Sequence, residues 1–362
     1  MRKYWLPLLC LLLLVAGCDG GEETPAATPA EPETGGEVQE LTLMTHDSFD
    51  ASEDVIAEFE QAHNVRLVIL PSGDAGTALN QAILAGDNPL ADVFYGVDNS
   101  FLSRALEAGI FESYESPLLA EIPDEFELDP ENRLLPVDYG DVCLNYDIAW
   151  FEENGLEPPD SLEALAEPDY RGLLVVENPA TSSPGLSFLL ATINRFGTEG
   201  DYTYLDYWRD LRENDVLVTN DWNEAYYGHF SVASDGDRPL VVSYATSPPA
   251  EVIFADPPRE DAPSASVTAP GACFRQIEFA GVLAGTEQPE LARALVDFLL
   301  GERFQEDIPL RMFVYPVNEN ADLPEEFVRF AQVAAEPATV PPEEIDANRE
   351  AWIDAWTDVV LR

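Results

Sequence analysis

The sequence predicts an α/β fold in which mostly parallel strands are flanked by helices. From about residue 39 onward, short apolar runs rich in β-branched residues alternate with segments whose apolar residues recur at helical spacing. This order of strand and helix favours a parallel sheet with helices on both faces. About 324 of the 362 residues follow residue 38, and single cores stop growing near ~250–300 residues, so two domains are expected.

Residues 1–17 are typical of a lipoprotein signal peptide. Arg2 and Lys3 form a basic head, and the uncharged apolar stretch 5–17 is shorter than the ~20 residues of a membrane-spanning helix. The ending Leu-Val-Ala-Gly-Cys resembles a bacterial lipobox, which predicts cleavage before Cys18 and lipidation of that cysteine. The alternative is an ordinary cleaved signal followed by an incidental cysteine.

Residues 18–38 are expected to be a disordered acidic linker. Residues 19–38 contain six acids, no Lys or Arg and no aromatic residue, with repeated Pro, Gly, Thr and Ala. Such a segment cannot bury enough apolar surface to offset the entropy of ordering it. The linker would therefore separate the lipid anchor from the folded part.

The first block of elements follows the linker. A helix is expected after a capping box in which Asp50 is the N-cap and Glu53 lies three residues later. Strands are predicted at 40–45, 65–70 and 91–95, and further helices near 77–84 and at 98–106.

A second block begins after the irregular acidic segment 113–133. Strands are predicted at 134–146, 173–177, 216–219, 240–244 and 272–283, and helices at 161–166, 184–196, 202–212, 224–230, 289–300, 325–335 and 345–360. Trp352 and Trp356 are four residues apart on one helix face, which favours a place in the core.

The charge excludes some partners. The formal net charge is −51, and Lys3 is the only lysine. Nucleic acids and anionic lipid surfaces are disfavoured, because binding to phosphate requires a basic surface. A cationic ligand would be attracted, although acid excess of this size more often reflects solubility in a salty habitat.

Catalytic and metal-binding signals are weak, so no catalytic residue, metal or cofactor is expected. The three histidines have no metal-ligand spacing, and there is no phosphate-binding loop, nucleophile elbow or HExxH motif. Cys143 is the one conceivable nucleophile.

Two cysteines, Cys143 and Cys273, remain in the folded part once the leader and the lipidated residue are set aside. Outside the cytosol they can form a disulfide that closes a loop of about 130 residues. Two free thiols are the alternative.

Candidate ligand-binding residues lie in loops at the predicted carboxyl ends of strands, where open α/β sheets bind ligands. Ser182 and Ser183 open a helix and either bind an oxyanion or simply cap it. Trp222 and Tyr244 offer aromatic faces to a flat cation, unless they belong to the core. Asp47 and Asp98 could pair with a ligand amine or could cap helices.

An ordered set of short motifs then becomes informative. These are DSF at 47–49, ADV at 91–93, GVDN at 96–99, VDYG at 137–140, NP at 178–179, TSSPGL at 181–186, WNEAY at 222–226, VSYATSP at 242–248 and YPV at 315–317. Together they resemble the thiamine-binding components of bacterial ABC importers, in the iron, thiamine and polyamine branch of type 2 periplasmic-type binding proteins. The resemblance runs from about residue 41 to the C-terminus.

The resemblance implies a two-lobed fold that closes on its ligand. Lobe 1 would hold 39–140 and 276–362, and lobe 2 would hold 141–275. Each lobe would be a mostly parallel sheet flanked by helices, and hinge strands carrying Cys143 and Cys273 would join them. Together with the lipobox and the acidic charge, it implies a monomer outside the cytoplasm that is held to the membrane by lipid on Cys18. This monomer would deliver thiamine to permease and ATPase subunits and would not bind nucleic acid.

The resemblance assigns site residues as well. Asp74 and Ala75, with Ser182 and Ser183, would face the hydroxyethyl or phosphate end of thiamine. Trp222 would cover the ring system. Tyr244 with Ala245, Thr246 and Ser247 would line the other wall and hydrogen-bond the aminopyrimidine.

Departures from the family pattern leave alternatives open. His46 and Ala250 stand where the family usually has aromatic residues, and Ala75 replaces a glycine. The adjacent Tyr226 and Tyr227 suit a ferric-ion receptor, and the acids suit a polyamine receptor. A thiamine-cleaving enzyme with Cys143 as nucleophile and a surface antigen that binds no small molecule are the alternatives of other classes.

Overall fold

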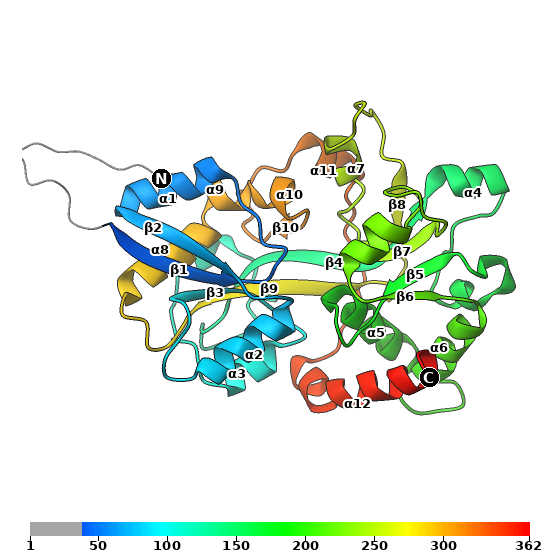
Figure 1. The fold of residues 1–362 in the computed structure, drawn as a ribbon, viewed down its shortest axis with the longest axis horizontal. Coiled ribbons are helices and arrows are strands. Elements are labelled where there is room, and N and C mark those ends of the chain that lie inside the picture. Colours follow the sequence, from blue (N-terminus) through cyan, green and yellow to red (C-terminus); the bar gives the residue numbers. More distant parts are fainter. Residues whose placement is uncertain (1–37) are drawn as a thin grey trace, which may run out of the picture. The chain divides into compact units, whose positions relative to one another are not determined.

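A computed structural model describes residues 38–362 of the chain. The expected signal peptide, Cys18 and the linker up to residue 37 lie outside this described part. Within it, strands and helices alternate, which confirms the predicted α/β class (Figure 1).

One mixed sheet contains the ten strands found in the described part. They are β1 (Gln39–Thr45), β2 (Val65–Pro71), β3 (Val93–Asp98), β4 (Leu135–Asp147), β5 (Leu174–Glu177), β6 (Leu217–Thr219), β7 (Leu240–Tyr244), β8 (Ser264–Val267), β9 (Phe274–Val282) and β10 (Tyr315–Pro316). The strand order is β2-β1-β3-β9-β4-β7-β5-β6, and β8 and β10 pair additionally with β4.

The two ends of this sheet are parallel, as predicted, and its middle is antiparallel. β1 pairs in parallel with β2 and β3, and β5 pairs in parallel with β6 and β7. Between them β4 and β9 run antiparallel, from Leu135 opposite Ala280 to Val142 opposite Phe274. These two long strands connect both ends of the sheet in Figure 1.

Helices cover both ends of the sheet. The α-helices are α1 (Glu53–His63), α2 (Ala75–Ala85), α3 (Leu102–Glu107), α4 (Ile148–Asn154), α5 (Ser183–Phe196), α6 (Tyr204–Glu213), α7 (Ala250–Ile253), α8 (Pro289–Leu300), α9 (Glu302–Gln305), α10 (Ile308–Arg311), α11 (Glu325–Phe330) and α12 (Pro342–Val360). Short 3₁₀ helices occur at Pro117–Glu121, Asp124–Phe126, Glu163–Ala166 and Pro168–Tyr170, and a π-helical turn occurs at Glu224–His229. None of the helices within residues 38–362 has the length and apolarity that crossing a bilayer requires.

Two large hydrophobic clusters lie on either side of the middle strands. The first is built from β1, β2, β3 and α8, and the second from β5, β7, α5 and α6. Ile345, Trp352 and Trp356 on α12 pack into the second cluster, although lobe 1 was expected to contain all of 276–362. The reason is that the Trp356 indole meets Trp208 of α6 edge-on, with ring centroids 5.4 Å apart. The lobe boundaries themselves stay a prediction.

The capping box at the start of α1 was predicted wrongly. The helix begins at Glu53, its N-cap is Ser52, and the N-cap side chain makes no capping hydrogen bond. Both Ser52 donors go instead to the Asp307 carboxylate, at 2.7 Å from the backbone N and 2.6 Å from Oγ. Asp50 pairs with Arg311 at 2.5 Å, so long-range partners override the local motif.

The two buried cysteines lie where the middle strands meet. Cys143 lies on β4 and Cys273 immediately precedes β9, and they form a disulfide with sulfur atoms 2.06 Å apart. Both side chains are fully buried, in a small cluster with Ala245 and Ala334. The disulfide therefore joins the two strands that connect the ends of the sheet.

Candidate functional site

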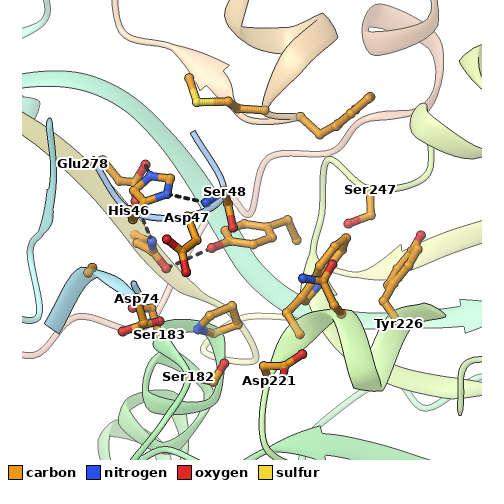
Figure 2. Close-up of a pocket in the computed structure, with 18 of the residues that line it drawn as sticks. His46, Asp47, Ser48, Asp74, Ser182, Ser183, Asp221, Tyr226, Ser247 and Glu278 are labelled. Atoms are coloured by element: carbon orange, nitrogen blue, oxygen red, sulfur yellow. Dashed lines mark hydrogen bonds and ion pairs between the residues drawn. The ribbon is translucent and has the colours of Figure 1, made fainter. Parts of the chain in front are cut away.

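A cavity of about 510 Å³ opens where loops from both ends of the sheet converge (Figure 2). The loop after β1, the start of α2 and the loop after α10 supply one side. The start of α5, the π-helical turn and the loop after β7 supply the other, while β9 supplies Gln276 and Glu278. The lining residues are His46, Asp47, Ser48, Asp74, Ala75, Thr181, Ser182, Ser183, Pro184, Asp221, Trp222, Asn223, Tyr226, Tyr227, Tyr244, Ser247, Ala250, Gln276, Glu278, Arg311, Met312 and Phe313.

The start of α5 presents hydrogen-bond donors to the cavity. Ser182 is the N-cap and accepts from the backbone N of Gly185 at 3.4 Å. The Ser183 hydroxyl is buried without a hydrogen-bond partner among the described residues. Gly185 allows this close packing, because a Cβ atom there would lie 2.7 Å from the Glu177 carbonyl oxygen of β5.

Asp74 faces this helix start from the other side of the cavity. Burial raises the pKa of its carboxyl group, against the lowering effect of the backbone N–H groups of Gly76 and Ser183. Figure 2 shows Asp74 and Ser183 next to each other. The predicted residues Asp74, Ala75, Ser182 and Ser183 thus all line one cavity, with the starts of α2 and α5 facing each other.

An aromatic wall stands beside this group. The Trp222 ring stacks on Tyr226 with centroids 4.8 Å apart and an interplanar angle of 19°, and the Tyr227 ring meets it edge-on. The Trp222 Nε1–H donates to Ser243 Oγ at 2.8 Å. The Ser243 hydroxyl is in turn hydrogen-bonded to the Ser247 hydroxyl at 2.8 Å. These contacts fix the indole plane. Tyr226 and Tyr227 come from the π-helical turn, a rare geometry that often marks functional sites.

Tyr244 lines the same cavity as Trp222, from the end of β7. Its hydroxyl donates to Gln276 Oε1 at 3.2 Å, and an added Cβ at Gly140 would come within 2.7 Å of its ring. The two aromatic residues that the sequence singled out therefore share one crevice.

A buried group of ionisable side chains lies at one end of the cavity. His46 Nε2 lies 3.3 Å from Glu278 Oε2, and the Tyr95 hydroxyl donates to Asp138 and, at 3.3 Å, to Glu278. Burial and the neighbouring Glu278 charge raise the pKa of Asp138 well above its usual value. Burial also opposes ionisation of Glu278, but His46 and the hydrogen bonds from Tyr95 and Asp138 outweigh it and lower the Glu278 pKa.

The net charge of the lining is negative. The lining contains four acidic residues and two basic ones. The acidic residues are Asp47, Asp74, Asp221 and Glu278, and the basic ones are Arg311 and His46. Arg311 is already paired with Asp50. A cation is therefore the ligand charge that this cavity favours.

Three residues of the predicted site do not line the cavity. Asp98 is 1% exposed, and its carboxylate accepts from the backbone N of Ser100 at 2.7 Å and from the Ser100 hydroxyl. Burial raises its pKa to about 6. Ala245 packs beside the disulfide, and Thr246 is fully buried, so the chain after Tyr244 returns to the cavity at Ser247 and Ala250.

The structure also places the residues on which the two rival hypotheses depend: Cys143 for the enzyme and the Tyr226–Tyr227 pair for the ferric-ion receptor. Cys143 is tied in the disulfide and is not among the cavity residues. Tyr226 is buried and donates to Glu251 at 2.8 Å, and burial raises the pKa of both Tyr226 and Tyr227. Within residues 38–362 no group of three or more His, Cys, Asp or Glu is arranged to hold a metal ion.

Sequence reasoning missed Gln276 and Glu278, which lie on β9 rather than in a loop. One signal was available, since Glu278 interrupts the apolar end of the segment FRQIEFAGV. A charged residue in a buried strand needs partners, and here they are His46 and Tyr95. Their identity depends on tertiary placement and could not be inferred from spacing.

The fold and the site define a class: a binding protein of the periplasmic type, whose cavity lies between loops from two α/β halves. The chain belongs to the bacterial extracellular solute-binding proteins, because the profile of that family matches residues 88–333. The thiamine-binding periplasmic protein of Escherichia coli K12 is 33% identical over 331 residues, which cover 89% of this chain and 94% of that protein. The thiamine-binding periplasmic protein of Brucella suis biovar 1 is 28% identical over 328 residues, covering 89% and 92%.

Solved structures agree with this membership. A periplasmic thiamin binding protein superposes with a TM-score of 0.76 at 31% identity, covering 91% of this chain and 98% of that one. Iron-bound HitA from Pseudomonas aeruginosa shares the fold, with a TM-score of 0.70 at 20% identity and coverage of 89% and 99%. The comparisons confirm the two-lobed, type 2 fold and the resemblance to thiamine-binding members of the family.

Proposed function

We propose that this protein is the thiamine receptor of an ABC importer. The observation that supports this most is the acidic cavity with a braced indole: Trp222, stacked on Tyr226, lies among four carboxyl groups and two basic side chains. Thiamine is a flat heteroaromatic cation, so an aromatic face and surrounding carboxylates suit it. The relatives named for thiamine binding support the same ligand.

In this proposal each wall of the cavity contacts one part of thiamine. The free face of Trp222 covers the ring system. Tyr244 and Ser247 provide the hydrogen-bonding wall for the aminopyrimidine. Asp74, Ala75 and the donors of Ser182 and Ser183 at the start of α5 face the hydroxyethyl group or its phosphate ester. In this proposal thiamine is bound without being cleaved, and Cys143, the nucleophile of the rival hypothesis, is tied in the disulfide outside the cavity.

Transport adds two further elements to the proposal. Cys18 would carry the lipid that holds the protein to the membrane outside the cytoplasm, and the folded part would act as a monomer that hands thiamine to the permease and ATPase subunits. Cell fractionation checks the anchor: the intact chain should sediment with membranes, and the Cys18→Ser variant should not. Equal distribution of both would contradict the anchor and leave the ligand proposal standing.

Isothermal titration calorimetry with thiamine, ferric ion and spermidine tests the ligand. The expected result is binding of thiamine at micromolar concentration or tighter, with little heat from the other two. A visible charge-transfer band on adding ferric ion would instead favour the iron receptor. Release of free thiazole from thiamine and an added amine would favour the enzyme.

A further inference from the structure

The pair His46–Glu278 offers an inference that rests on the proposed thiamine function and deepens it. Both residues line the cavity, and the imidazole Nε2 lies 3.3 Å from a Glu278 carboxylate oxygen (Figure 2). Each side chain is only 12% exposed. Burying an unpaired carboxylate costs free energy, and a nearby positive charge reduces that cost. Either a protonated imidazole or a ligand cation can supply this charge.

We infer that His46 acts as an internal cation that competes with the ligand, so that thiamine binding to this protein is linked to the release of a proton from the imidazole. Below the His46 pKa of the ligand-free protein, the imidazolium neutralises Glu278. When the positive ring of thiamine enters near Glu278, like charges repel and the imidazole gives up one proton to the buffer. The neutral imidazole keeps its Nε2–H and still donates it to Glu278.

The surroundings of His46 favour such an exchange. Burial lowers the pKa of His46, but the charge and the hydrogen bond of Glu278, with smaller effects of Asp138 and Asp74, more than offset it, so the pKa is raised overall. These acids come from β9, β4 and the start of α2, and Tyr95 of β3 packs against the ring with centroids 5.6 Å apart. Asp47 and Arg311 are further charged residues of the cavity.

The backbone adds a second reason why protonation opposes ligand binding. The N–H of Ser48 donates to His46 Nδ1 at 3.1 Å, which requires a lone pair on that nitrogen. A proton on Nδ1 removes this acceptor and frees the turn that carries Asp47 and Ser48, both of which line the cavity. The neutral imidazole therefore also holds the turn in its binding position.

Space for the imidazole is built into the sheet. Gly96 of β3 has a φ of +99°, and a Cβ atom there would collide with the His46 ring. The ring thus occupies a defined position against the strand rather than a mobile surface position. Its place between β3 and Glu278 makes it a positioning and specificity-determining residue for the charge of the ligand.

Calorimetry at several pH values, in buffers of different ionisation enthalpy, tests this directly. The range is kept above the titration of the aminopyrimidine of thiamine itself. Thiamine affinity should weaken by up to about tenfold for each pH unit below the His46 pKa of the free protein, with up to about one proton released per thiamine bound. The uncharged oxidation product thiochrome should show a weaker pH dependence, because it lacks the charge repulsion and only the effect on the Asp47–Ser48 turn remains.

Two variants identify the group that titrates. His46→Gln should lose most of the pH dependence and the proton release, because a glutamine cannot carry the charge. His63→Gln is the matched control, since His63 is exposed on α1 and outside the cavity, and it should retain both. A pH dependence that persists in His46→Gln would assign the proton to Asp138 or Asp74 and overturn the inference.

NMR titration of the His46 imidazole in the unmodified protein gives a measurement that needs no variant. By reciprocity, saturating thiamine should lower the apparent pKa of His46. An unchanged imidazole titration, or thiamine binding that releases no proton at any pH, would overturn the inference and leave the thiamine function intact. A protein that binds no thiamine at any pH would overturn the proposed function and this inference with it.

Discussion

At the scale of single residues, the site depends on side chains whose orientation other residues determine. The Trp222 indole is held by stacking on Tyr226 and by its hydrogen bond to Ser243. Such bracing fixes the ring before a ligand arrives, which reduces the entropy lost on binding. Trp222 should therefore contribute more to affinity than its contact area alone would suggest.

Replacing Trp222 by alanine should weaken thiamine binding by at least about tenfold, equal to ~1.4 kcal/mol. Trp222→Phe, which keeps a ring, should lose less. The matched control is Trp150→Ala: Trp150 is half-buried on α4, packs on Phe151 and is not a cavity residue. Calorimetry with thiamine gives the three affinities, and equal losses at both tryptophans would remove Trp222 from the site.

The buried carboxyl group of Asp98 should make the stability of the protein, and not ligand binding, depend on pH. Burial raises its pKa in the folded protein to about 6, from 3.8. The folded state therefore holds the proton more tightly than the unfolded state, and stability falls as pH rises from about 4 to 6. At roughly 1.4 kcal/mol per pH unit, the cost of the charged form at neutral pH is about 3 kcal/mol.

Asp98→Asn should remove that cost. Its free energy of unfolding, relative to the unmodified protein, should rise by up to about 3 kcal/mol between pH 4 and pH 7. Urea unfolding at a series of pH values measures the difference, with Asp169→Asn at an exposed position as the control. Parallel pH curves for Asp98→Asn and the unmodified protein would contradict the burial argument.

At the scale of elements, β4 and β9 matter most, because they connect both ends of the sheet and carry part of the cavity. β9 supplies Gln276 and Glu278, and the disulfide ties its start to β4. Ala245 packs against this disulfide immediately after Tyr244. The covalent link thus lies close to one wall of the cavity.

Removing the disulfide should lower stability. The bond closes a sequence separation of 130 residues, and bonds of this kind stabilise by about 2–4 kcal/mol, chiefly through the unfolded chain. The double variant Cys143→Ala and Cys273→Ala should lose that amount in urea unfolding under oxidising conditions. Under reducing conditions the difference between the two proteins should vanish, and a difference that persists would point to packing around Ala245 and Ala334 instead.

The element scale also shows what local sequence could and could not predict. The start of α5 was predicted correctly, because Ser182 and Pro184 specify a helix start by themselves. The start of α1 was not, since Asp307, more than 250 residues away, accepts both Ser52 donors. Helix 325–335 was predicted too long: α11 ends at Phe330, and the N–H of Gln332 donates to the carbonyl of Ala245.

At the scale of the whole molecule, the ordered motifs predicted the two-lobed fold. Eight of the eleven predicted site residues line one cavity, and long-range contacts determined the rest of its lining. Asp74, Ser183, Trp222 and Tyr244 meet because each lies at or near the end of a strand or the start of a helix. The pairing of Glu278 with His46 escaped prediction, because a strand residue and a loop residue 232 positions apart share no local pattern. Asp98 was expected in the site, but its carboxylate turns to Ser100 instead.

The large negative charge belongs to the same scale. With a formal net charge of −51, the chain repels itself as well as anions and attracts cations generally. Attraction at long range is weakened by salt, whereas contacts inside a buried cavity are weakened much less. In the proposed function, selectivity for one cation would therefore come from the cavity, and above all from the Trp222 face and from Glu278.

A crystal structure of the protein grown with thiamine tests the central claim most directly. The account predicts the ring system in the cavity of Figure 2, lying against the Trp222 indole, with its positive ring on the side of Glu278. Thiamine bound elsewhere on the protein, or held in this cavity without contact to Trp222, would contradict it.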